Sequence, residues 1–218
     1  MSVPALRLHQ LVSPALPVGA FSYAEGLEVL VQEGRLADGA AVAAWLEAEL
    51  TRGAVRLEAA ALLPLGEALV AQDLTALREL EGWLLAQREA PELRAQQRQM
   101  GRSLGQLLAD LGWPPPVPFP FSWPVAFAWA GICLEIPGEA LVEAYLYGWA
   151  ANQLSAAVRL VPLGPTEGQR LQLALAPRIA AEAGFLVGHD PRNLWSGGVG
   201  AGLAQLRHAE LYSRLFRS

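Results

Sequence analysis

Histidine and cysteine are the residues of this chain best suited to catalysis or metal binding, and there are few of them. The three histidines, His9, His189 and His208, are far apart, and no two are spaced by four residues as on a zinc-binding helix. The single cysteine, Cys133, excludes an intramolecular disulfide and a metal cluster built on several cysteines. These four side chains are possible ligands for a transition metal, but their spacing predicts no metal site.

Other catalytic signatures are also missing. The sequence has no nucleotide-binding glycine loop of the usual types and no serine in a nucleophile elbow. All sixteen basic residues are arginines, so a Schiff base and a P-loop lysine are both impossible. His189 precedes Asp190, which could orient a catalytic imidazole, but the following proline favours a turn. We therefore predict no catalytic residue, no enzyme activity and no tightly bound cofactor.

Composition restricts the partners. With a formal net charge of −5 and no block of basic residues, the chain has no field that would attract nucleic acid or an anionic membrane. The apolar run 123–134 is too short to span a bilayer, and the longer run 141–163 contains Glu143 and Arg159. The N-terminus lacks the features of a signal peptide. We expect a soluble cytoplasmic protein whose 53% hydrophobic residues include protein-binding surfaces.

Helical periodicity dominates the sequence, and no run of alternating β-branched residues competes with it. We predict an all-α fold, a single domain over residues 1–218 built as a bundle of roughly eight to ten helices. Capping residues and prolines set the expected bounds, including a capping box formed by Thr166 and Gln169. The expected helices are 38–53, one from 54 with a kink or break at Pro64, 73–84, 91–112, 124–134, 137–161, 166–184 and 203–216.

Two segments do not fit a helical pattern. Residues 113–123 (WPPPVPFPFSW) contain five prolines, which predicts an extended connector between two helical halves. We favour a strap packed on the protein's own core over a proline-rich ligand for another domain. Gly101 and Gly105 form a smooth strip on the preceding helix, where another backbone could approach. From residue 185 the pattern dissolves, so residues 185–218 are expected to form a flexible C-terminal tail, mobile in isolation.

Three unusual stretches remain without a catalytic or core-packing explanation. They are residues 13–28 (SPALPVGAFSYAEGLE), 145–169 (YLYGWAANQLSAAVRLVPLGPTEGQ) and 206–218 (LRHAELYSRLFRS). In this order and at these distances they resemble the urease accessory protein F family, over the whole chain. Ala24 and Glu25 depart from the small residues usual before Gly-Leu-Glu in the first stretch, which we call the N-terminal signature.

The resemblance implies a urease maturation factor, an all-helical and often dimeric protein without catalysis of its own. Such a protein would bind the D (or H) component of the urease accessory proteins and a nickel-carrying GTPase, the G component. The assembly would dock on apo-urease and couple GTP hydrolysis to nickel insertion, with nickel handled by the complex. A generic helical interaction scaffold unrelated to urease is the alternative. A hydrolase that uses His208 with Glu210 is a second rival, disfavoured by the missing nucleophile.

The same resemblance assigns binding of the D/H component to the N-terminal signature and the C-terminal tail. The simpler alternatives are a frayed, solvated C-terminus and, in the N-terminal signature, aromatic residues that only complete the core. Against a frayed C-terminus, arginines among apolar residues are typical of a segment that folds onto a partner. The predicted residues are Phe21, Tyr23, Glu28, Arg207, His208, Tyr212, Arg214, Leu215 and Phe216.

Three arginines are candidates for contact with the GTPase. Arg98 and Arg102 share one helix face with Arg94. The alternative is an ordinary solvated helix face, which would need no partner. Arg159 is the one charge in residues 154–163, so it is either a buried structural arginine or a partner-facing residue. An arginine that enters the GTPase site in trans is the sharper hypothesis.

Overall fold

The computed structural model describes residues 3–118 and 120–218, and this part of the chain forms ten α-helices, two short 3-10 helices and no β-strand. The prediction of an all-α fold is confirmed. The elements are α1 (Val3–Leu11), η1 (Ala20–Ser22), α2 (Leu27–Gln32), α3 (Gly39–Arg52), α4 (Ala54–Val70), α5 (Leu74–Ala86), α6 (Pro91–Asp110), α7 (Trp123–Cys133), α8 (Gly138–Leu160), α9 (Pro165–Leu186), η2 (Pro191–Asn193) and α10 (Val199–His208).

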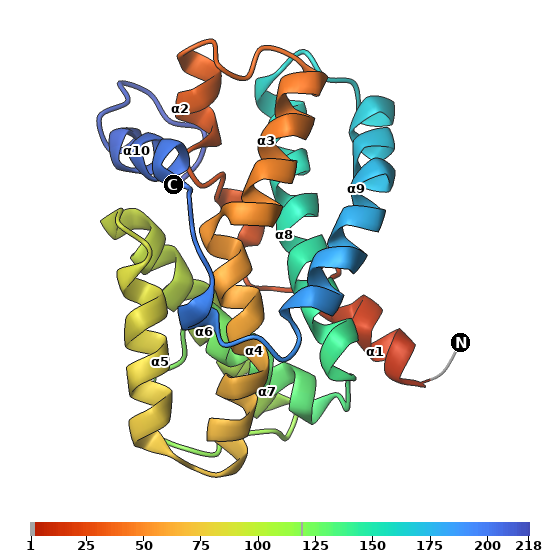
Figure 1. Cartoon of the computed structure of the whole chain (residues 1–218), viewed down its shortest axis with the longest axis vertical. Helices are drawn as coiled ribbons and strands as arrows, with labels where there is room; N and C mark the ends of the chain where they lie inside the picture. Colours follow the sequence, from red (N-terminus) through yellow and green to blue (C-terminus); the bar gives the residue numbers. More distant parts are fainter. Residues whose placement is uncertain (1–2, 119) are drawn as a thin grey trace.

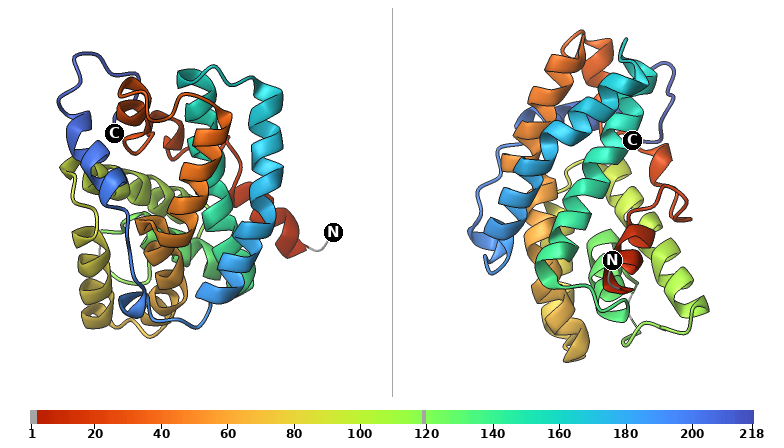
Figure 2. Two further views of the ribbon diagram at one scale, coloured as in Figure 1. Left: turned by 45° about the horizontal axis from the view of Figure 1, so that its top comes forward. Right: turned by 90° about the vertical axis from the view of Figure 1, so that its right-hand side faces the viewer.

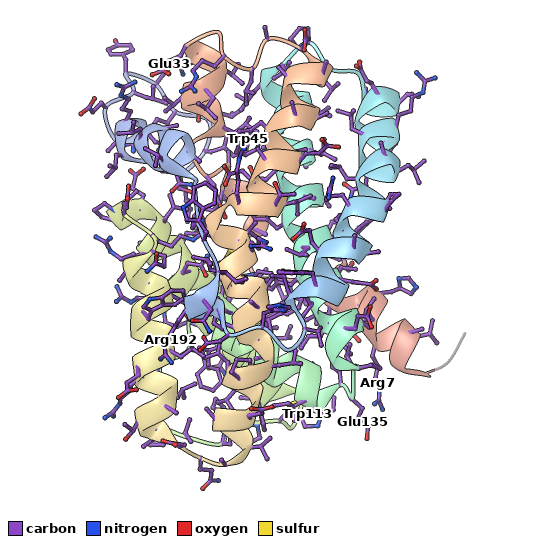
Figure 3. The ribbon with its side chains drawn as sticks, viewed as in Figure 1. Arg7, Glu33, Trp45, Trp113, Glu135 and Arg192 are labelled. Carbon is purple, nitrogen blue, oxygen red and sulfur yellow. The ribbon has the colours of Figure 1, made fainter. Side chains whose placement is uncertain are left out.

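The core is built around α4, which packs against α3, α5, α7 and α8 (Figure 1). Most of its side chains are buried, as expected of a helix that is apolar on nearly every face. The α8 helix packs against α9, and α1 projects from the bundle beside α8 (Figure 1). Arg7 of α1 forms an ion pair with Glu135 between α7 and α8 (Figure 3). Among the described residues, no helix combines the length and the apolarity needed to cross a bilayer.

Local capping chemistry explains the helix bounds that the sequence predicted correctly. The carboxylate of Asp38 accepts the Ala41 N–H at 2.8 Å at the start of α3, and Asp73 accepts two N–H groups at the start of α5. Pro91 occupies the first turn of α6, and Gly112 follows that helix with φ +95°. These helices therefore begin and end where side-chain caps and backbone conformation require.

The expected bounds of the last two helices were wrong. The α9 helix begins at Pro165 after Gly164, so Thr166 lies inside it and no side chain caps its start. It also continues two residues past Gly184, to Leu186. Pro64 does not break α4, which runs through it, and the kink expected as the alternative stays a prediction. The last helix, α10, covers Val199–His208 rather than 203–216, and the final ten residues follow the surface without helix.

The proline-rich connector lies against the protein's own core, as predicted, although its residue 119 is outside the described part. Val117, Phe121 and Ser122 are buried. The Ser122 N–H donates to the buried carboxylate of Glu81 at 2.7 Å. The indole N–H of Trp129 donates to the carbonyl oxygen of Trp113 at 3.2 Å, where the connector begins (Figure 3). The connector is therefore a strap that covers α6 and α7.

Gly101 allows the strap to reach α6. A Cβ atom built on Gly101 would overlap the carbonyl oxygen of Phe121 and the backbone of Ser122. At Gly105, one turn along, an added Cβ would make an ordinary contact, 3.9 Å from the Phe121 ring. The close backbone approach predicted for this strip is confirmed, and Gly101 is the residue that requires it.

We expect Gly101→Ala to destabilise the protein by about 1–3 kcal/mol, because the strap backbone must move away from α6. Gly105→Ala is the matched control, since it adds the same methyl group to the same helix without a clash. It should be neutral or stabilise by up to about 1 kcal/mol through helix propensity. Urea denaturation of both variants measures the difference. Equal stabilities would show that the strap does not depend on Gly101.

The C-terminal segment returns to the N-terminal part of the chain. After α9 it passes α4 at η2, then forms α10, which packs against α2 and α6. Its end lies beside the segment that contains η1 and α2 (Figure 2). The structure gives residues 185–218 a defined path along the body, and their mobility in solution stays a prediction.

Candidate partner-binding site

The two ends of the chain meet in one site, which we call the junction: residues 22–28 of the N-terminal signature and residues 205–218 of the tail. The Ala24 N–H donates to a main-chain oxygen of Ser218 at 3.0 Å, and the Arg217 N–H donates to the carbonyl oxygen of Ser22 at 2.8 Å. Ser218 is fully buried. Two of the three stretches that carry the resemblance thus form a single structural unit (Figure 2).

The carboxylate of Glu28 holds the tail to the first turn of α2. One oxygen accepts the Leu215 N–H at 2.8 Å and the other accepts the Phe216 N–H at 3.1 Å. Glu28 is buried, and two backbone donors of this kind offset the cost of removing a carboxylate from water. The Phe216 ring is also buried, and the Arg159 guanidinium lies 4.7 Å from its centroid.

His208 links α10 to α6 through a carboxylate. Its Nδ1 lies 2.7 Å from an oxygen of Glu92, whose other oxygen accepts from Arg214 at 2.8 Å. Its Nε2 lies 3.6 Å from Glu28 and makes no hydrogen bond among the described residues. The alternative hydrolase hypothesis needs a His208 ring that a substrate can reach. His208 has no exposed surface, so its ring is not accessible to a substrate.

Gly26 provides the space in which α10 packs. Its φ of +82° lies in the left-handed region, and a Cβ atom there would stand 2.8 Å from the backbone nitrogen of Gln205. The preceding residue, Glu25, also has a left-handed φ, +49°. Its carboxylate is buried in the core beneath the junction, where it joins an ionic cluster.

Arg88 is the centre of this cluster, in which Glu25, Glu58 and Arg88 are all buried. The Nε of Arg88 donates to Glu58 at 2.7 Å, and its Nη1 donates to Glu25 at 3.3 Å. Burial by itself lowers the pKa of Arg88, but the charges of Glu58 and Glu25 outweigh it and raise that pKa. The guanidinium is therefore charged at every pH at which the protein folds.

Neutral side chains complete the cluster and connect it to the tail. The Tyr145 hydroxyl donates to Glu58 at 2.7 Å, and burial, followed by the charge of Glu58, raises the pKa of Tyr145 well above its ordinary value. Gln96 donates to Glu25 at 3.0 Å and accepts from the Ser218 hydroxyl at 2.6 Å. The last residue of the tail is thus hydrogen-bonded to the ionic core.

A half-buried carboxylate, that of Glu49, lies where α3 meets the start of α10. Burial raises the pKa of Glu49 to about 7; Arg88 opposes this shift and Glu25 adds to it. The carboxylate is 3.9 Å from the position of a Cβ built on Gly198, the residue before α10. At neutral pH Glu49 is therefore partly protonated, and it contributes less negative charge than its type suggests.

The possible nickel ligands do not come together. Burial raises the pKa of the Cys133 thiol to about 11, so at neutral pH the thiolate that binds metals is scarce. His189 stacks on Phe185 with ring centroids 4.1 Å apart, in the turn that the sequence predicted. Within the described residues, no group of three or more histidine, cysteine, aspartate or glutamate side chains is arranged to hold a metal ion.

The structure divides the residues predicted to bind the D/H component into two sets. Tyr23, Glu28, His208 and Phe216 are buried and make up the inside of the junction. Phe21, Tyr212 and Leu215 are exposed on its outside, at 71%, 106% and 52%. Arg207 and Arg214 are also exposed, and Arg207 forms an ion pair with Glu33 of the α2–α3 turn (Figure 3).

The three arginines assigned to the GTPase do not form one site. Arg98 and Arg102 are exposed on α6, and Arg102 donates to Gln99 on the same helix. Arg159, near the end of α8, is exposed and covers Phe216, so the alternative of a buried structural arginine is wrong. Any shared role of Arg159 with the other two stays a prediction.

Sequence reasoning missed the ionic cluster beneath the junction. Arg88, Glu58, Glu92 and Tyr145 were not singled out. The sequence did contain one signal for Glu58, which is the single acid in the apolar run 57–63. Arg159 was selected as a candidate for the same reason, as the one charge in residues 154–163. The partners of that charge come from α6 and α8, and no local spacing connects those helices to α4.

The fold and the junction define an all-helical protein in which the two chain ends lie side by side. A family model described as UreF matches residues 36–176. The chain is 42% identical to the urease accessory protein UreF of Microcystis aeruginosa, covering 98% of this chain and 97% of the relative. It is 41% identical to that of Thermosynechococcus vestitus at the same coverage, and 36% identical to that of Prochlorococcus marinus over the full length of both. The chain belongs to the UreF family of urease accessory proteins.

We expect Gly26→Ala to loosen the junction, because the added methyl group meets the backbone of α10. Gly19→Ala is the matched control: its φ is +74°, and nothing lies within 4 Å of the added Cβ. Both variants should lose about 1 kcal/mol from the left-handed conformation, and Gly26→Ala should lose about 1–3 kcal/mol more. Urea denaturation measures the stability, and limited trypsin digestion reports cleavage at Arg207 and Arg214. Equal cleavage in the two variants would contradict this description of the junction.

Proposed function

We propose that this protein is a non-catalytic adaptor in urease maturation. It binds the D/H component through the outside of the junction and engages the nickel-carrying GTPase. The resulting assembly couples GTP hydrolysis to nickel insertion into apo-urease. Membership of the UreF family supports the place of the chain among the urease accessory proteins. The homodimer, the cytoplasmic location and the passage of nickel through the complex, without a tightly bound cofactor here, belong to the same proposal.

One observation carries the proposal: the tail presents large apolar side chains to solvent although it is held in place by buried groups. Leu206, Tyr212 and Leu215 are 41%, 106% and 52% exposed. The inner face of α10 uses small residues, Ala201 and Ala204, and its larger residues face outward: Val199 and Leu203 are 72% and 48% exposed. Exposed aromatic and aliphatic side chains on a fixed backbone are typical of a protein-binding surface.

The hydrogen bonds that attach the tail to buried groups also favour binding. A partner that meets a tail already fixed by Glu28 and Phe216 does not have to order it, so less of the interaction energy is lost to entropy. Arg207 and Arg214 lie beside the apolar residues and each has an acidic neighbour, which fixes their position at the rim. The alternative, a generic helical scaffold unrelated to urease, would use the same kind of surface and would differ only in the partner that it binds.

We expect the double variant Tyr212→Ala/Leu215→Ala to weaken binding of the D/H component by at least tenfold, because truncated anchors typically cost more than about 1 kcal/mol each. Its thermal stability should not change, since both side chains are exposed. Leu173→Ala, which removes a 74% exposed leucine from α9, is the matched control and should bind normally. Calorimetry with the purified component measures the affinities. Wild-type affinity of the double variant would refute the proposed surface.

The contact with the GTPase is tested by replacing Arg98, Arg102 and Arg159 singly by alanine and measuring GTP turnover in the assembled complex. If one of them acts in trans, its loss should lower turnover by a factor of about 10³ or more. Arg170→Ala, an exposed arginine on α9, is the control. No loss in any variant would rule out an arginine supplied by this chain and leave a role in which it sets the geometry of the GTPase.

A further inference from the structure

A cavity of about 390 Å³ lies between the N-terminal signature, α6 and α8. Exposed residues, among them Phe21 and Tyr147, surround its entrance. Its walls are largely apolar and aromatic and include Trp123 and Trp149. Its floor is the ionic cluster beneath the junction, with Glu25, Glu58 and Gln97 among the lining residues. The proposed function makes no use of this cavity.

The floor carries an excess of negative charge. Of the described residues that line the cavity, the charged ones are Glu25 and Glu58, which are 6% and 3% exposed. Both form an ion pair with the same guanidinium, that of Arg88. Two carboxylates and one guanidinium leave one formal negative charge in a buried place, where an uncompensated charge is costly. The charge balance therefore favours a cation.

A buried acceptor without a partner points the same way. Gln97 is 3% exposed, and its Nε2 donates to Glu58 at 3.1 Å. Because a carboxylate only accepts, the orientation of this amide is fixed, and its Oε1 remains an acceptor. That oxygen has no hydrogen-bond partner among the described residues, whereas the matching oxygen of Gln96 accepts from Ser218. An unpaired buried acceptor calls for a ligand with an N–H or O–H donor.

The remaining surface of the cavity defines the rest of the ligand. The apolar walls suit an alkyl chain, and the faces of Trp123, Phe127 and Trp149 suit a cation. All four oxygens of Glu25 and Glu58 already accept hydrogen bonds from Arg88, Gln96, Gln97, Tyr145 or Trp149. A group with several N–H donors can share such oxygens, whereas a metal ion would have to displace those donors.

We propose that this cavity binds an alkyl guanidinium or alkyl ammonium group, with its charged end beside Glu25, Glu58 and Gln97 and its alkyl stem along the aromatic walls. Such a group is supplied either by an arginine or lysine side chain of another protein or by a free small molecule. The entrance contains Phe21, a residue already assigned to partner binding, so a side chain that enters here would anchor a protein at the edge of the junction.

The chain offers a direct probe, because it contains two methionines and Met100 lines the cavity. The full-length protein, labelled with ¹³C at the methionine methyl groups, is titrated with agmatine, an alkyl guanidinium. The neutral amide pentanamide is the control ligand. We expect agmatine to shift the Met100 signal to saturation and pentanamide to leave it unchanged.

Two glycine variants make the test specific for this cavity. Gly148 lines it on α8, and a Cβ atom there has nothing within 4 Å, so Gly148→Leu fills the cavity without displacing the ionic cluster. Gly82→Leu adds the same side chain on the exposed face of α5, where an added Cβ also has nothing within 4 Å. Agmatine should bind Gly148→Leu at least tenfold more weakly than wild type, and Gly82→Leu should bind like wild type.

Three results would overturn the proposal: no shift of the Met100 signal with agmatine, an equal shift with pentanamide, or equal agmatine affinity in both glycine variants. Selective broadening of the Met100 signal by substoichiometric Ni²⁺, with no response to agmatine, would assign the cavity to a metal and would also overturn it. Competition then separates the two sources. If agmatine displaces the D/H component, the cation belongs to a partner; if the complex is unaffected, it is a free small molecule. Failure of the proposed function would leave the agmatine result intact.

Discussion

The buried charge of Arg88 is the constraint on which the rest of the structure depends. Arg88 lies in the turn before α6, and its guanidinium forms ion pairs with Glu25, just before α2, and with Glu58 on α4. Removing one partner from such a cluster leaves an unpaired buried charge and typically costs about 3–5 kcal/mol. A cluster of this kind adds little net stability, but it tolerates few other arrangements of these elements. It therefore fixes where the N-terminal signature lies on the helical body.

The tail depends on that placement. Once Glu25 is fixed, Gly26 offers its bare backbone to α10 and Glu28 directs both carboxylate oxygens at the tail. The last serine then reaches Gln96, which is itself a member of the cluster. The inside of the junction thus combines these polar groups with the buried rings of Tyr23 and Phe216, whereas Tyr212 and Leu215 face solvent. This separation supports the proposed partner surface, because binding residues on a fixed backbone lose little entropy on association.

Much of the helical framework follows from local chemistry. Asp38, Asp73 and Pro91 identify helix starts because the first N–H groups of a helix need acceptors or a residue without a donor, and this need is met within a few residues. The prediction failed where two local signals competed. Pro165 and Thr166 both suit a helix start, and the proline began α9, with the threonine inside. The strap was predictable for a similar reason, since five prolines exclude helix.

The sequence by itself determined the all-α fold, the family and the three stretches that carry the resemblance to it. It did not determine which residues of those stretches are buried. The order of residue types along the chain does not say which side of a segment faces the core or which distant residues contact it. Phe21 and Tyr23 look alike in the sequence, yet one is 71% exposed and the other 6%. Only the tertiary structure decided this, since α2, α4, α6, α8 and α10 come from distant parts of the chain. The pairing of Arg88 with two carboxylates, and the cavity above them, exist only when those helices are packed together.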